Sequence, residues 1–156
     1  SRVYPWPQLI RDGLDIKYEK YGDGLIVIEG CARGADEIAH DWCEEKGFDT
    51  RHHRCFPIDW EKARRERMDW KAVGPERNTT MLKEQPDQVI GFHERLDYER
   101  GGTTNMLLKG LLIGVPVWLV PQNNLKSARR LSLDEFSKSK IKRTRYELKR
   151  ANLVSE

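Results

Sequence analysis

Residues 30–36, Gly-Cys-Ala-Arg-Gly-Ala-Asp, combine the backbone and side-chain types best suited to binding an anion. They follow an apolar run at residues 25–28 and precede a helical pattern at residues 37–46. A glycine turn between a strand and a helix exposes backbone N–H groups at the positive end of the helix, where phosphate binds. We therefore interpret this stretch as an anion-binding loop.

Two glycines and one arginine support this interpretation. Gly30 and Gly34 permit close backbone approach, and Arg33 offers forked donors to a phosphate or carboxylate. The same glycines also suit a plain strand-to-helix turn, with Asp36 interacting only with the helix dipole. The ligand-binding residues predicted here are Gly30, Cys31, Ala32, Arg33, Gly34 and Asp36.

A second glycine turn precedes another predicted helix, at residues 103–112. Between the two turns in sequence lie Arg77 and Asn78, near the start of a helix predicted from Pro75 to Lys83. Arg77 offers forked donors, and Asn78 offers a donor and an acceptor suited to a base or ribose edge. In an open parallel sheet, ligands bind beyond the carboxyl ends of the strands. We therefore add Arg77, Asn78, Gly101, Gly102, Thr103 and Thr104 to the predicted ligand-binding residues.

Carboxylates that could act as an acid or base lie in the polar loop before the second turn. They are Glu94, Asp97 and Glu99, which with Arg77 are the candidate catalytic residues. The alternative is an ordinary solvated loop.

Cysteines and histidines show no metal-binding spacing. Cys31, Cys43 and Cys55 are odd in number, and we predict reduced thiols in a reducing compartment. His40 and Cys43 share a helix face, but two ligands make no zinc site. His52 and His53 point to opposite faces of a strand. We therefore predict neither a metal nor a cofactor.

The elements that must position these residues alternate along the chain. Apolar runs predict strands at residues 25–28, 50–56, 87–92 and 115–120, and periodic patterns predict helices at residues 8–21, 35–46, 59–73, 75–83, 103–112 and about 133–151. The pattern at residues 59–73 breaks at Gly74-Pro75. This alternation predicts an α/β fold with a parallel sheet flanked by helices.

Composition divides the 156 residues into a body and a basic tail. With 38% hydrophobic residues, residues 1–120 can form one domain, followed by a helical extension at residues 121–156. That extension has ten basic and four acidic side chains, which suit either contact with nucleic acid or simple solvation. The extension could pack on the body, join a partner chain or fray. No apolar run reaches the length of a membrane span, so we expect a soluble cytoplasmic protein that does not bind membranes.

Four ordered motifs carry a family resemblance. The chain resembles the YspA-like branch of the SLOG superfamily, which includes the DNA-processing protein DprA and the LOG phosphoribohydrolases. The motifs are Gly30-x-Ala32-Arg33-Gly34-Ala35-Asp36, Phe56-Pro57-x-Asp59-Trp60, Gly74-Pro75-x-Arg77-Asn78-x-x-Met81 and Gly102-Thr103-x-x-Met106. The resemblance implies a Rossmann-like fold whose pocket takes a nucleotide or a nucleotide-derived ligand.

The resemblance also bears on the start of the chain. The family begins with a strand that ends in Gly-Ser-Arg, and Ser1-Arg2 look like the end of that motif. Ser1 and Arg2 therefore join the predicted ligand-binding residues, and the family's usual first strand is expected to be missing from this chain.

Departures from the family pattern decide between binding and catalysis. The LOG enzymes use an arginine, which Arg77 resembles, and a glutamate whose position falls on Met106. Methionine cannot act as an acid or a base. We therefore expect a protein that binds a nucleotide or a nucleotide-derived small molecule without turnover. We also expect the protein to be a homo-oligomer. The alternatives are a nucleoside 5′-monophosphate phosphoribohydrolase-like enzyme and a DprA-like binder of single-stranded nucleic acid, the latter using the basic C-terminal helix.

Overall fold

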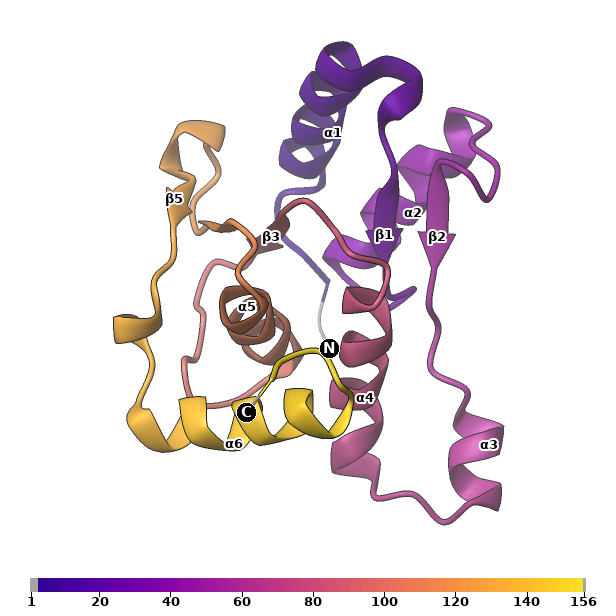
Figure 1. The fold of residues 1–156 in the computed structure, drawn as a ribbon. Helices are drawn as coiled ribbons and strands as arrows, with labels where there is room; N and C mark the ends of the chain where they lie inside the picture. The colour runs from indigo at the N-terminus through magenta and orange to yellow at the C-terminus, as the bar shows by residue number, and fades with distance from the viewer. Residues whose placement is uncertain (1–2, 156) are drawn as a thin grey trace.

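The computed structural model describes residues 3–155 (Figure 1). Ser1 and Arg2, which were predicted to bind the ligand, therefore lie outside the described residues. The helices in the described part are α1 (Pro7–Tyr21), α2 (Ala35–Glu45), α3 (Trp60–Arg65), α4 (Trp70–Leu82), α5 (Gly102–Ile113) and α6 (Lys138–Arg150). The strands are β1 (Val27–Glu29), β2 (His53–Cys55), β3 (Val89–Phe92), β4 (Val117–Val120) and β5 (Arg129–Arg130).

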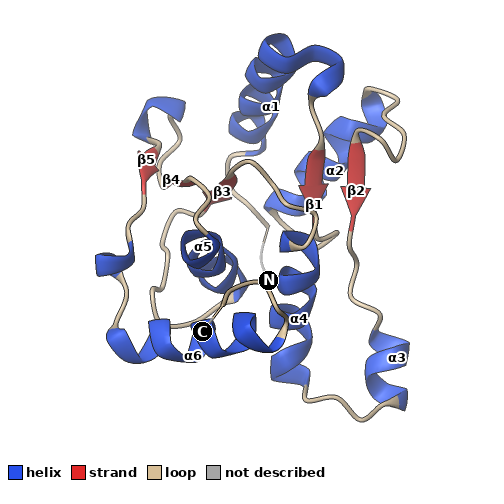
Figure 2. Cartoon of the chain, in the orientation of Figure 1, coloured by secondary structure: helices blue, strands red, loops and turns tan. Residues whose placement is uncertain are grey.

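The α/β class is confirmed, but the strands form two sheets (Figure 2). β1 and β2 pair in parallel, and β3 pairs in parallel with β4, whose other edge carries the antiparallel β5. Within residues 3–155, no strand pairs with both β1 and β3, so the predicted strands do not join into one sheet. In Figure 1, α4 lies below β1 and β2 and to the right of α5.

Each sheet has its own apolar core. Val27 of β1 packs with Trp42 and Cys43 of α2, and Leu14 and Tyr18 of α1 cover them. The second core gathers α5, β4 and the C-terminal extension; its buried members are Leu107, Leu108, Val117, Leu119, Leu131 and Phe136. Burial of these apolar side chains fixes the helices on their strands.

The helical stretch between β2 and β3 differs from its prediction. α3 ends at Arg65, and α4 begins at Trp70, where the Asp69 carboxylate accepts the Lys71 N–H. α4 continues through Gly74-Pro75, so the predicted break there is wrong. A proline in a helix removes a single intrahelical hydrogen bond, and the packed helix tolerates this loss. Arg77 and Asn78 consequently lie inside a helix and not at its start.

The C-terminal extension packs on the body. β5 adds to the sheet, and Ser132 and Glu135, whose spacing in the sequence is that of a capping box, form this box at a short 3₁₀ turn, Leu133–Glu135. α6 begins after this turn, at Lys138, which is later than predicted, and it buries Thr144 and Leu148. Among residues 3–155, none of the helices combines the length and apolar character that crossing a membrane requires.

Candidate functional site

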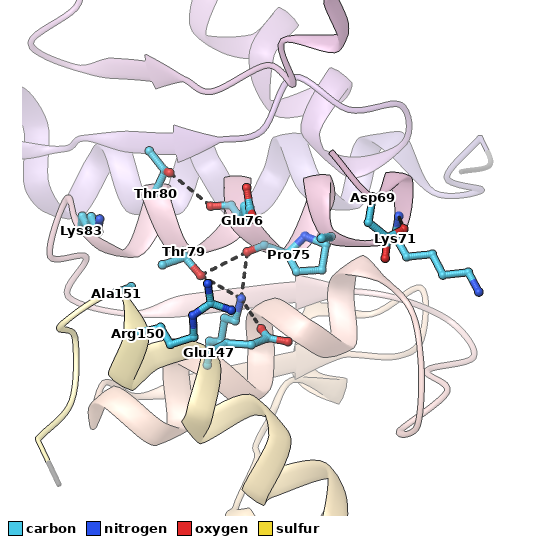
Figure 3. A pocket seen from close by; sticks show the side chains of 12 residues that line it. Asp69, Lys71, Pro75, Glu76, Thr79, Thr80, Lys83, Glu147, Arg150 and Ala151 are labelled. Carbon is cyan, nitrogen blue, oxygen red and sulfur yellow. Dashed lines mark hydrogen bonds and ion pairs between the residues drawn. The ribbon is translucent and has the colours of Figure 1, made fainter. Parts of the chain in front are cut away.

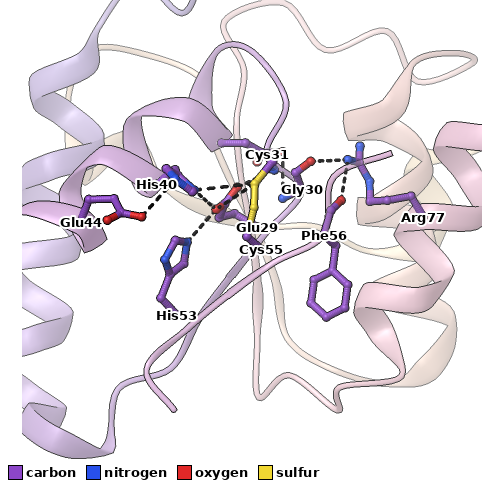
Figure 4. Close-up of a disulfide and its surroundings, with 10 residues drawn as sticks. Glu29, Gly30, Cys31, His40, Glu44, His53, Cys55, Phe56 and Arg77 are labelled. Carbon is purple, nitrogen blue, oxygen red and sulfur yellow. Dashed lines mark hydrogen bonds and ion pairs between the residues drawn. A yellow bond between two sulfur atoms is a disulfide. The ribbon is translucent and has the colours of Figure 1, made fainter. Parts of the chain in front are cut away.

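Arg77 contacts the first glycine turn. Its Nη1 donates to the carbonyl oxygen of Gly30 at 2.5 Å and to that of Phe56 at 3.3 Å (Figure 4). A Cβ atom on residue 30 would lie 2.6 Å from Cζ of Arg77, so only glycine admits this approach. Arg77 therefore ties the end of β1 to the segment that follows β2.

Asn78, the next residue, reaches the second glycine turn. Its Nδ2 donates to the Gly102 carbonyl oxygen at 3.1 Å and to Asn105 Oδ1 at 3.2 Å, and its Oδ1 accepts from Arg77 Nε at 3.2 Å. Two adjacent side chains of α4 thus bind two turns that lie about seventy residues apart in sequence. The structure brings together the three segments that were predicted to form one site.

Both turns end at the N-terminus of a helix. Gly34 precedes α2 with φ of 87°, and Gly101 precedes α5 with φ of 108°. Neither helix has a side-chain hydrogen bond at its N-cap. These left-handed backbone positions favour glycine, and the first N–H groups of an α-helix have no partner within the helix itself.

Asp36 binds the turn itself. Its carboxylate accepts the N–H of Gly30 at 3.2 Å and also the N–H of Ala32. Burial, and then repulsion from Glu29, raises the pKa of this carboxyl above its ordinary value, although Arg77 opposes the shift. Asp36 therefore stabilises the loop backbone and is not merely a dipole partner of α2.

The remaining predicted residues differ in exposure. Arg33, Gly101 and Gly102 are exposed, and Ala32 and Thr103 are half-buried. Thr104 is buried, and its hydroxyl donates to the carbonyl oxygen of Asp97. It therefore fixes the preceding loop onto α5.

The three loop carboxylates do not gather around Arg77 in any contact of the described residues. Asp97 accepts the Glu99 N–H at 2.9 Å, as in an ordinary polar turn, and both side chains are exposed. Glu94 lies near Tyr4, where burial and this neighbouring charge raise the pKa of the phenol to about 12.

Cys31 and Cys55 form a disulfide, so the prediction of reduced thiols is wrong for this pair (Figure 4). The parallel register places Glu29 opposite Cys55, and Cys31 follows Glu29 by two residues at the same end of the strands. Cys31 has φ of 53°, which turns the chain back toward β2. Sequence spacing could not reveal this pairing, because it depends on which strands are neighbours.

A polar cluster surrounds the disulfide. Glu29, only 2% exposed, lies 2.8 Å from Nδ1 of His40 and 2.7 Å from Nε2 of His53. The hydrogen bond that the Glu29 carboxylate accepts from His40 is the main cause that raises the pKa of His40. Our sequence reasoning treated these residues separately and missed the cluster. The available signal was a glutamate that ends an otherwise apolar strand.

Two cavities have linings that include none of the residues of the glycine turns. The larger, about 550 Å³, lies between α4, α5 and α6, with Pro75, Thr79 and Glu147 in its lining (Figure 3). The other, about 460 Å³, lies beside the disulfide and is lined in part by His40, His53 and Cys55. We give more weight to the turns than to the larger cavity, because the buried Lys109 ammonium beside that cavity already has partners: Glu147 Oε2, the Pro75 carbonyl oxygen and Thr79 Oγ1, each at 2.8 Å.

Comparison with known proteins gives one informative match. No protein-family model matches the chain, and no solved structure matches it. The Gene 61 protein of Mycobacterium phage D29 is 30% identical over 124 residues, which cover 75% of this chain and 88% of that protein. The chain therefore belongs to the same family as the Gene 61 protein of Mycobacterium phage D29.

Proposed function

We propose that this protein binds a nucleotide or a nucleotide-derived small molecule at its two glycine turns, without turnover. The observation that carries the proposal is the pair of adjacent side chains on α4, Arg77 and Asn78, which bind the carbonyl groups of Gly30 and Gly102. A nucleotide presents both a phosphate and a base or ribose edge, and two fixed turns can contact both parts.

The chemistry of the turns favours a phosphate group. The N-termini of α2 and α5 each follow a glycine, which has no capping side chain, and they offer backbone N–H groups and the positive end of the helix dipole. Arg33 adds an exposed cation on the first turn. The resemblance to the SLOG superfamily adds support, because that resemblance implies a nucleotide-type pocket at this loop.

Binding without turnover follows from the side chains around the second turn. Met106, which stands where the resemblance places a catalytic glutamate, offers neither a proton nor a negative charge. Cleavage of a glycosidic bond needs a carboxylate to stabilise an oxocarbenium-like sugar. The nearby Asp97 instead accepts a backbone N–H in its own turn.

Calorimetry with adenosine and guanosine 5′-monophosphates tests the proposal on three matched variants. Gly34→Ala and Gly101→Ala should each weaken binding at least about tenfold, because a methyl group strains the turn that carries the N–H donors. Gly47→Ala is the control: its φ of 71° imposes similar strain, but it lies beyond the other end of α2. Its affinity should stay within about twofold of wild type.

Chromatography of the same mixtures should detect no release of free base. Base release by the wild-type protein that Arg77→Ala abolishes would contradict the binding-only function. If Gly34→Ala, Gly101→Ala and Gly47→Ala all bind the monophosphates with the same affinity, the glycine turns are excluded as the binding site. Strongly salt-dependent binding of single-stranded oligonucleotides, without monophosphate binding, would instead indicate a nucleic-acid binder.

A further inference from the structure

We propose that the disulfide cluster is a zinc site in the reduced protein, with Cys31, Cys55, His40 and Glu29 as the four ligands. This site shares Cys31 with the first glycine turn, but it goes beyond the proposed nucleotide function, and its test involves no nucleotide. Four residues from β1, β2, α2 and the first glycine turn place one sulfur, nitrogen or oxygen atom each within 4.8 Å of one another.

Two of the separations between these atoms already suit a tetrahedral ion. Sγ of Cys31 lies 3.7 Å from Nδ1 of His40 and 3.7 Å from Oε2 of Glu29. The ligand atoms of a tetrahedral zinc ion lie about 3.3–3.8 Å apart, given its bond lengths to sulfur, nitrogen and oxygen. The Glu29–His40 separation of 2.8 Å must widen by about half an ångström. His40 has room for this movement because its side chain is 32% exposed.

The ligand types select the metal. Two thiolates and an imidazole are soft or borderline donors that favour zinc over magnesium or calcium. With Glu29 as the fourth ligand, all positions come from the protein, as in structural zinc sites.

The surrounding residues already provide the supporting hydrogen bonds that such sites need. Nε2 of His40, which would point away from the ion, lies 3.4 Å from a carboxylate oxygen of Glu44. Nε2 of His53 lies 2.7 Å from Glu29, whose other oxygen accepts the Cys31 N–H. A carboxylate on the far nitrogen of a ligating histidine fixes its tautomer and orientation.

A dithiol can reduce the Cys31–Cys55 disulfide to the two thiols that the zinc site requires. The dithiol gives two electrons and two protons to the Cys31–Cys55 disulfide and becomes a disulfide itself, so the S–S bond of the protein breaks and two thiols form. One Zn²⁺ then binds and displaces the two thiol protons into solvent. The cavity of about 460 Å³, lined in part by Cys55 and His40, provides access for the ion.

The test uses the full chain, reduced with a phosphine under nitrogen and titrated with Co²⁺ and then Zn²⁺. We expect one metal per chain, with thiolate-to-cobalt charge-transfer absorption that zinc removes. Cys55→Ser should weaken the affinity for metal by at least about 100-fold, and His40→Ala by at least about tenfold; loss of a group that only hydrogen-bonds to a ligand typically costs 10–100-fold.

Cys43→Ser is the matched control. Cys43 is buried in the core, where burial raises the pKa of its thiol to about 12, and it is not among the clustered ligands. Its variant should bind metal within about threefold of wild type. The oxidised protein should show no charge-transfer band.

The proposal is overturned if the reduced wild-type protein, with native circular dichroism, binds neither metal at micromolar concentration. Equal loss of affinity in Cys43→Ser and Cys55→Ser would also exclude it. If Cys55→Ser does not fold, the stoichiometry and absorption bands of the wild-type protein, together with His40→Ala, still decide the outcome.

Discussion

At the scale of single residues, the first glycine turn is a charged junction built on Gly30. Its N–H donates to Asp36, and its carbonyl oxygen accepts from Arg77. The absence of a side chain at residue 30 lets the guanidinium lie against the backbone. Asp36 and Arg77 therefore hold the two peptide groups that flank the Gly30 Cα atom, and each substitution there acts on the loop conformation as well as on any ligand.

Asp36→Asn tests the electrostatic part of this junction. The pKa of Asp36 is raised in the folded state, so between about 3.8 and that raised pKa the native protein binds more protons than the unfolded chain. The unfolding free energy of the wild-type protein should therefore fall as pH rises through this window. Asp36→Asn removes this contribution.

Urea unfolding of both proteins from pH 4 to pH 7 measures the effect. The unfolding free energy of the wild type minus that of Asp36→Asn should decrease as pH rises. A difference that is constant over this range, or that shifts in favour of the wild type, would contradict the raised pKa.

At the scale of elements, α5 lies close to β3 and β4 because glycines stand at the contact. A Cβ atom on Gly110 would lie 2.9 Å from Cγ2 of Val117 and 3.1 Å from Cγ2 of Val89. On the strand side, a Cβ on Gly91 would lie 2.9 Å from Cδ2 of Leu107. Larger side chains would push the helix off the sheet and displace the N-terminus of α5, where the second glycine turn lies.

Gly110→Ala should therefore lower the unfolding free energy by about 1–3 kcal/mol through overpacking. This loss outweighs the gain of about 1 kcal/mol that alanine normally gives within a helix. Chemical denaturation of Gly110→Ala and of the control Gly74→Ala separates the cost of overpacking from the gain in helix propensity. The control isolates the propensity gain, because nothing lies within 4 Å of a Cβ at residue 74 in α4. Gly74→Ala should stabilise by about 0.5–1 kcal/mol. A stabilised Gly110→Ala would show that the helix can move without penalty.

At the scale of the whole molecule, Lys109 joins three helices. Its ammonium, on α5, donates to Pro75 and Thr79 of α4 and pairs with Glu147 of α6. Desolvation by burial is the main cause that lowers the pKa of Lys109, while Glu147 favours the charged form. The basic extension is therefore anchored to the same helix that positions both glycine turns.

Glu147→Gln and Lys109→Met separate the roles of the two partners. Glu147→Gln leaves a buried ammonium without a countercharge and should lower the unfolding free energy by about 1–3 kcal/mol. Lys109→Met removes that charge and fills a similar volume, so its effect should stay within about 1 kcal/mol. Thermal and urea denaturation at pH 7 compare them. If Lys109→Met lowers the unfolding free energy more than Glu147→Gln does, the hydrogen bonds from Lys109 to α4 contribute more to stability than its ion pair with Glu147.

The sequence by itself determined the local features of this protein. The α/β alternation, the end of α1 at Gly22, the end of α5 at Gly114 and the capping box at Ser132 are all predictable. Each depends on residues within a few positions of one another, so propensity, periodicity and capping are sufficient. The predicted break at Gly74-Pro75 failed because tertiary packing stabilised α4 beyond what its local sequence favours.

Only the tertiary structure decided which distant residues meet. The disulfide of Cys31 with Cys55, the buried Glu29 between two histidines, and the contact of Arg77 with Gly30 all require knowledge of which strands and helices are neighbours. The parallel register of β1 and β2 brings Cys31 to Cys55, 24 positions further along the chain, and no local pattern encodes that register. It is set by tertiary packing, in which side chains from separate segments, such as Val27 of β1 and Trp42 of α2, must fill the same space.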